Sequence, residues 1–401
     1  MTFSFAVEIL SYILLASVFL FYLAYYLLLR RYHTNARDVK NNANPGPRFF
    51  PMVSMIIPVY NEGKTIQKKL ENIKSLRYPE EKLEAIFVDG CSTDKTAEII
   101  QSYIDNECSF MRLVQQECRK GYNEGVVDGL AVSSGEIVVL TDAGAYYDPD
   151  ALRYLVGHFE DPQVGAVTGR EVVANEDGVL AAKLESTYRS FYDFMRSAEA
   201  KMDSTPDLKG ELSAVRKKIC VRTAEKVRKS PNASFDCCVP YQARMEGHTV
   251  VYEGEAFYSE RAPATFRGRM RQQVRRGTIL IAALLLFKDM IFDGKYGKFG
   301  TVILPAHLMM LVVLPWVFLS GVATFVVATV MDPIMNVVAL GVFVVPILLS
   351  SRVRLFVVAF VQSQLALVAA LWRVVMRRES LFIETIPSTR VCQSESREVS
   401  S

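Results

Sequence analysis

The feature that most constrains this chain is an uncharged apolar run over residues 9–29, close to its N-terminus. At about 1.5 Å per residue, a helix of this length matches the thickness of a bilayer core. A signal peptide is the alternative. However, no basic segment precedes the run, and the bulky Arg30 and Arg31 follow it where a cleavage site needs small residues. The sequence therefore predicts a membrane anchor over residues 1–30, followed by a linker over 31–50.

Three more apolar stretches occupy the C-terminal quarter, at 302–330, 334–350 and 353–376. The first two are separated by Met331-Asp332-Pro333, a turn signal that suits a hairpin. The third has arginines at both ends and is interrupted by Gln362-Ser363-Gln364, so a crossing helix and an interfacial helix both remain open for it.

Basic residues follow the first span, and none precedes it. Because basic residues collect on the cytoplasmic side of membrane spans, we expect a multi-pass protein of the cell membrane, in contact with lipids, whose main domain is cytoplasmic. The remaining segments are expected to be a catalytic domain, an amphipathic interfacial segment, a cluster of transmembrane or interfacial helices, and a cytoplasmic tail. Their ranges are 51–278, 279–300, 301–376 and 377–401.

The charges of the chain are nearly balanced, with 46 Lys and Arg against 43 Asp and Glu. A dedicated nucleic-acid binder normally has a clear basic excess, so we expect no nucleic-acid partner. Half of the residues are hydrophobic, which excludes a disordered chain.

Apolar runs that are typical of buried strands alternate with helical patterns between the membrane segments. The expected strands are 53–59, 85–89, 113–114 and 137–141, and a helical segment at 122–133 separates the last two. This alternation predicts an α/β domain with a largely parallel sheet and helices on both faces. Ligands of such sheets bind beyond the carboxyl ends of the strands.

Acidic residues stand at three of these strand ends, namely Glu62, Asp89 and Asp142. Carboxylates that converge on one edge are unfavourable without a cation or a donor-rich ligand. The alternative is that each acid only caps the next helix. We favour capping for Asp94 and a functional role for Asp89 and Asp142.

The segments IIPVYNE, VDGCSTDKT and LTDAGAYYDPDAL resemble the nucleotide-sugar half of family 2 glycosyltransferases, which are inverting enzymes with a GT-A (Rossmann-like) mixed sheet. The resemblance covers residues 52–278. With its flanking spans, the chain is similar to the membrane-bound hyaluronan, chitin and poly-N-acetylglucosamine synthases. The resemblance implies a base and ribose pocket formed by Pro58, Tyr60, Glu62 and Asp89.

The resemblance also implies that Asp142 belongs to a D-x-D motif that holds Mg²⁺ or Mn²⁺ on the diphosphate of the donor. Such a hard cation neutralises charge on the departing nucleotide. Two positions depart from the family pattern: Gly144 replaces the second Asp, and Tyr122 stands where a Lys is common.

In the second half, Asp236 lies eleven residues before Gly247, which resembles the spacing of the family's E-D…R…G segment. The resemblance implies that Asp236 is the general base that deprotonates the acceptor. Gln272 and Arg275 match the family's Q-x-x-R-W motif, in which they contact the donor diphosphate or sugar, and Arg276 replaces the Trp.

These features together predict a membrane-embedded inverting glycosyltransferase. It would transfer a sugar from a nucleotide-diphosphate sugar, with a UDP-sugar expected, to a saccharide or lipid-linked acceptor at the cytoplasmic face. Two alternatives remain open: a polyprenyl-phosphate sugar synthase, and a catalytically silent relative that acts as a membrane binding partner.

Overall fold

The structure is a computed structural model, and it describes residues 3–35, 49–173, 180–228, 230, 233–260, 265–333, 341 and 350–376. Three parts of the predicted organisation fall largely outside these residues, namely the linker at 31–50, the apolar stretch at 334–350 and the tail at 377–401.

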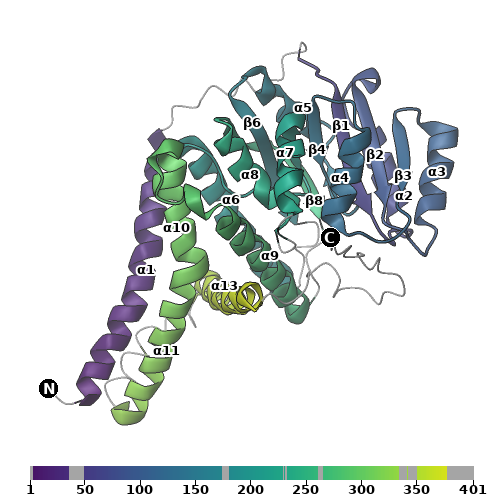
Figure 1. The fold of residues 1–401 in the computed structure, drawn as a ribbon. Coiled ribbons are helices and arrows are strands. Elements are labelled where there is room, and N and C mark those ends of the chain that lie inside the picture. Colours follow the sequence, from purple (N-terminus) through teal and green to yellow (C-terminus); the bar gives the residue numbers. More distant parts are fainter. Residues whose placement is uncertain are drawn as a thin grey trace, which may run out of the picture.

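The described residues form an eight-stranded sheet in the order β3-β2-β1-β4-β7-β6-β8-β5 (Figure 1). The first four strands pair in parallel, as the alternating pattern predicts. β7 then runs antiparallel to both β4 and β6, and β5 runs antiparallel to β8, so the mixed α/β sheet is confirmed. The strands are β1 Val53–Val59, β2 Leu83–Asp89, β3 Met111–Gln115, β4 Ile137–Leu140, β5 Tyr146–Tyr147, β6 Val164–Val173, β7 Ser213–Arg216 and β8 Thr249–Glu260.

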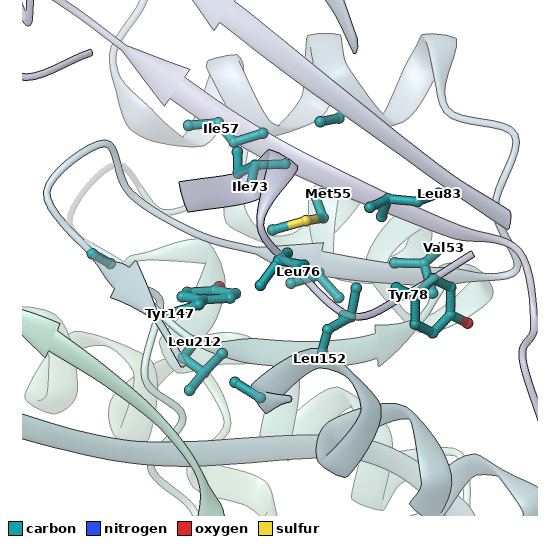
Figure 2. Packing of buried hydrophobic residues seen from close by; sticks show 14 of the residues in the cluster. Val53, Met55, Ile57, Ile73, Leu76, Tyr78, Leu83, Tyr147, Leu152 and Leu212 are labelled. Atoms are coloured by element: carbon teal, nitrogen blue, oxygen red, sulfur yellow. The ribbon is translucent and has the colours of Figure 1, made fainter. Parts of the chain in front are cut away.

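Helices cover both faces of the sheet, which explains why its central strands are apolar at nearly every position. Met55 and Ile57 of β1 pack on one face, where Figure 2 shows them beside Ile73 and Leu76. Ile56 packs on the other face. The first face is covered by α2 Ile66–Lys74, α3 Thr96–Glu107 and α5 Ala151–Gly157, and the second by α4 Tyr122–Val132, α7 Lys217–Val227 and α8 Phe235–Met245.

Three helices among the described residues are long and apolar enough to cross a membrane: Ser4–His33, Phe299–Met331 and Val353–Val375. The first lies within α1 Phe3–Asn35, and the second ends with α11 Leu314–Met331. These two helices run side by side away from the sheet (Figure 1).

The third apolar helix, α13 Ser351–Val375, packs against α9 Phe266–Leu286, with Gly277 of α9 close to Ala370. It is foreshortened in Figure 1, where α1 and α11 run lengthwise, so it runs in a different direction from these two helices. Its crossing of the membrane and its place at the interface both stay predictions. Its Gln362 accepts a hydrogen bond from the fully buried Arg269. α9 continues without a break through residue 278, where the catalytic domain was expected to end.

Candidate functional site

A cleft of about 470 Å³ opens at the carboxyl ends of β1, β2 and β4. Its other walls come from α8, α9 and the long helix α6 Leu180–Met202. Six of the residues predicted from the sequence line it, namely Pro58, Tyr60, Glu62, Asp142, Asp236 and Arg275. Asp89 and Gln272 are not among the described residues that line the cleft.

Asp142 and Asp236 reach this cleft from different parts of the fold. Asp142 follows β4 directly, whereas Asp236 lies in the first turn of α8. The N-cap position of α8 is occupied by Ser234, whose hydroxyl donates a hydrogen bond to Oδ1 of Asp236. The carboxylate of Asp236 lines the cleft and also accepts a hydrogen bond from the backbone N–H of Cys237.

The segment that precedes β7 brings another carboxylate to the cleft, that of Glu211. A Cβ atom on the neighbouring Gly210 would lie 2.7 Å from Oδ2 of Asp236, so this segment packs directly on the predicted base. Sequence reasoning missed Glu211. Because β7 is antiparallel, its beginning lies at the same edge as the ends of the parallel strands, and no local pattern reveals that reversal.

Burial and crowding shift the titration of these carboxylates. Burial, followed by the charges of Glu211 and Asp236, raises the pKa of Asp142 well above its usual range, although Arg275 and Lys69 oppose this. Burial also raises the pKa of Asp236 to about 6; Glu211 adds to this, and the hydrogen bond from Ser234 opposes it. Burial is the largest cause of both shifts and neighbouring carboxylates add to it, so a bound cation would favour the ionised forms.

Another wall of the cleft presents an aromatic ring and a guanidinium group. The guanidinium carbon of Arg119 lies 3.7 Å from the centre of the Tyr60 ring. Nη1 of Arg119 is buried and has no hydrogen-bond partner within the described part of the chain. Gln116 and Gly90 complete this corner. Arg119 was also missed, although it lies three residues before Tyr122, where the family pattern expects a Lys.

Asp89 and Gln272 lie outside the cleft wall for different reasons. The buried carboxylate of Asp89 accepts hydrogen bonds from the backbone N–H of Ser92 at 3.0 Å and from its hydroxyl at 2.5 Å, so it shapes the loop after β2. Asp94 accepts from the backbone N–H of Thr96 at the start of α3, which agrees with a capping role. Oε1 of Gln272 is buried without a hydrogen-bond partner among the residues described, and donor binding by Gln272 stays a prediction.

Comparison with known proteins decides the family. Residues 54–222 match the family model described as glycosyl transferase family 2. These residues form a family 2 glycosyltransferase domain.

Over 256 residues, or 63% of this chain, the protein is 26% identical to the poly-beta-1,6-N-acetyl-D-glucosamine synthase of Staphylococcus aureus strain COL, of which it covers 61%. The synthase of the same name from Staphylococcus epidermidis is 26% identical over 224 residues, which are 56% of this chain and 53% of that one. The chain thus spans less than two thirds of the length of these curated relatives.

Among solved structures, a mannosyltransferase from Pyrobaculum calidifontis in complex with GDP-Man and Mn²⁺ is similar with a TM-score of 0.77 and 27% identity. The match covers 93% of this chain and 100% of that one, so the likeness includes the apolar helices as well as the glycosyltransferase domain.

The cleft of the glycosyltransferase domain fits a divalent cation that is coordinated partly by the protein and partly by the phosphate groups of the bound donor. No group of three His, Cys, Asp or Glu side chains in the described ranges could hold a metal ion by itself. The donors of Asp142 and Glu211 are nevertheless oxygens, the type that Mg²⁺ and Mn²⁺ prefer, and the two carboxyl groups are close enough for the charge of Glu211 to raise the pKa of Asp142. The side of Gly144 is open, which leaves room where the second Asp of the motif is absent. Phosphate oxygens and water could therefore complete the coordination.

Proposed function

We propose that this chain is a membrane-embedded, inverting glycosyltransferase. It would transfer a sugar from a nucleotide-diphosphate sugar to a saccharide or lipid-linked acceptor at the cytoplasmic face of the cell membrane. The observation that carries the proposal is that Asp142 and Asp236 line one cleft. Inversion needs a group that steadies the leaving diphosphate and, across the reacting carbon, a base for the acceptor hydroxyl.

The nucleotide would bind at the ends of β1 and β2. Tyr60 and Arg119 offer a flat surface for the base, and the unpaired N–H of Arg119 can donate to a base or phosphate oxygen. Arg275 lines the cleft near Asp142 and suits the diphosphate, which a guanidinium can bind with two parallel hydrogen bonds. A UDP-sugar is the expected donor, and the GDP-Man complex of the mannosyltransferase makes GDP-mannose a second donor to test.

Asp142 would hold Mg²⁺ or Mn²⁺, with Glu211 beside it; the bound ion would supply positive charge that stabilises the departing nucleotide. Asp236 would accept the proton of the acceptor hydroxyl. The hydroxyl oxygen then forms a bond to the anomeric carbon of the donor sugar, and the bond from that carbon to the phosphate oxygen breaks. Its electron pair leaves with the nucleoside diphosphate. A base with a pKa of about 6 is ionised at neutral pH and still accepts a proton in the transition state.

The membrane helices support the proposed location. α1 and the Phe299–Met331 helix have the length and hydropathy of spans, and α9, whose side chains line the cleft, belongs to the same buried cluster as those helices. An acceptor in the cleft would therefore be close to the bilayer.

The test compares Asp236→Asn with the wild-type protein in membranes supplied with radiolabelled UDP-sugars or GDP-mannose. We expect Asp236→Asn to lower transfer by at least about a thousandfold, since a general base contributes 10²–10⁴-fold, while nucleotide binding changes little. Asp105→Asn, on the exposed side of α3, is the matched control and should retain full activity. Transfer that survives in Asp236→Asn would remove this residue from the base role, and an absence of nucleotide binding in the wild type would favour a silent relative.

A further inference from the structure

Two cations that line the cleft belong to an ion cluster centred on Glu171. Nζ of Lys209 lies 2.8 Å from one oxygen of Glu171, and Nη2 of Arg276 lies 3.9 Å from the other. Arg189 approaches the same carboxylate at 2.7 Å and is itself buried. Lys209 and Arg276 both line the cleft, whereas Glu171 and Arg189 do not. Two cations from distant parts of the chain therefore meet at one place on the wall.

This pair of cations begins next to the proposed base. Lys209 directly precedes Gly210, and the Cα of Gly210 packs so closely on Asp236 that an added Cβ would lie 2.7 Å from its Oδ2. An acceptor whose hydroxyl is at Asp236 would therefore have its neighbouring group beside Lys209.

Two carboxyl groups lie beside these cations: Glu171, which does not line the cleft, and Glu260, which does. Asp207 also lines the cleft, and it pairs with Arg196. Burial alone would raise the pKa of Glu171, but Lys209, Arg276 and Arg189 lower it. The single negative charge of Glu171 therefore interacts with three cations. Burial, followed by the charges of Glu211 and Glu171, raises the pKa of Glu260, and Arg276 opposes this.

Along α9 the cleft wall then changes from charged to apolar within one turn. Ile279 and Leu280 line the cleft three and four residues after Arg276, so they lie on the same face of the helix. α9 continues into the buried cluster that contains α10 Leu304–Leu308 and α13. Base, cations and aliphatic side chains therefore follow one another in the direction of the membrane helices.

We propose that the acceptor is a lipid-linked saccharide with a phosphate or diphosphate between sugar and lipid. Lys209 and Arg276 bind the phosphate group, Ile279 and Leu280 contact the first part of the lipid chain, and Asp236 faces the sugar hydroxyl. This inference rests on the proposed function and selects the acceptor class within it.

Two features weigh against the other acceptor classes. A neutral growing polysaccharide has no anionic group for Lys209 and Arg276. A bare lipid phosphate is already ionised and needs no base, which leaves Asp236 without a task. A lipid-linked sugar phosphate has a hydroxyl for Asp236. It also has a phosphate for Lys209 and Arg276, and a lipid chain for Ile279 and Leu280.

The experiment measures binding of geranylgeranyl diphosphate to the full-length protein in detergent, with saturating Mn²⁺ and either GDP or UDP to fill the donor site. Geranylgeranyl monophosphate, geranylgeraniol, inorganic diphosphate and a soluble oligosaccharide are the comparison ligands. We expect the two lipid phosphates to bind at least about tenfold more tightly than geranylgeraniol or inorganic diphosphate, because hydrogen bonds to charged groups and apolar contacts both contribute. Lys209→Met and Arg276→Gln should each weaken this binding about tenfold or more. Arg271→Gln, which removes an exposed cation from the same helix, is the matched control.

The proposal would be overturned if geranylgeraniol bound as tightly as the lipid phosphates, or if a soluble oligosaccharide bound more tightly than they do. Unchanged binding of the lipid phosphates in both Lys209→Met and Arg276→Gln would also overturn it. Ile279→Asn provides a second test: it should weaken the lipid phosphates and leave inorganic diphosphate unaffected. Nucleotide binding, measured in the same samples, separates the two hypotheses. Retained nucleotide binding without lipid-phosphate binding rejects only the acceptor class, whereas loss of both in the wild type rejects the proposed function.

Discussion

The amine of Lys69 donates a hydrogen bond to the carbonyl oxygen of Ala145 at 2.5 Å and so closes the short segment that carries Asp142. The same amine donates to Oγ1 of Thr141 at 2.9 Å and lies 4.6 Å from the centre of the Tyr147 ring. Lys69 is fully buried, and burial lowers its pKa to about 7 while Asp142 acts in the opposite direction. A buried cation thus supports the segment of Asp142, the proposed metal ligand, in a motif that has one carboxylate instead of two.

Lys69→Met should weaken nucleotide binding that depends on Mn²⁺ by about tenfold. The substitution leaves the Ala145 carbonyl without its donor, and an unsatisfied buried group costs about 1–3 kcal/mol, so the segment should shift. The measurement is a binding isotherm for GDP or UDP with and without Mn²⁺, together with the melting temperature. Lys82→Met, at an exposed position outside α2, is the control and should behave as the wild type. Unchanged Mn²⁺-dependent binding in folded Lys69→Met would show that the segment holds its shape without the amine.

Gly210→Ala should reduce transfer strongly while nucleotide binding persists. The added methyl group would lie 2.7 Å from Oδ2 of Asp236, closer than side chains tolerate, so the predicted base must move. A displacement of about 1 Å can cost roughly a hundredfold in rate. The kcat and KM for each substrate are the measurement. Gly157→Ala, whose Cβ would meet no described atom within 4 Å, should be neutral, and equal rates for both variants would contradict the proposed role of Asp236.

Asp142→Asn should make the ligand-free protein more stable at alkaline pH and, at the same time, inactive. The native state holds a proton on Asp142 at pH values where the unfolded chain, with a pKa of 3.8, has lost it. The stabilisation from this group is therefore present at low pH and is lost as the pH rises through the raised native pKa. We expect the melting temperature of Asp142→Asn in chelator to exceed that of the wild type by a few degrees at pH 8, at about 2–4 °C per kcal/mol, and by less at pH 5. A difference that shrinks as the pH rises would contradict this assignment of the charge.

Transfer should fall as the pH drops through about 6, the pKa of Asp236, because only the ionised carboxylate accepts the proton. The measurement is the dependence on pH of kcat/KM for the acceptor, made at saturating Mn²⁺ and donor so that Asp142 remains ionised. A midpoint near the usual aspartate value of about 4 would show that Asp236 is not the group that limits the rate.

Local patterns were enough to predict the architecture. An apolar run such as 9–29 needs no partner to be recognised, because the bilayer sets its length. Strands and helices of the α/β domain follow from short periodicities. The rule that ligands bind beyond strand ends predicts a functional role for Asp142. These features depend on neighbours in the sequence, so the sequence by itself determined them.

The tertiary structure decided which side chains meet. The reversal of β7 brings Glu211 to the cleft, the packing of α2 places Lys69 behind Asp142, and Asp89 turns to its own loop instead of the cleft wall. The orientation of α13 likewise follows from its contacts with α9 rather than from its hydropathy. Each of these depends on contacts between residues far apart in the chain, and the free energy of such contacts is set by burial and charge in the folded molecule, which no local periodicity records.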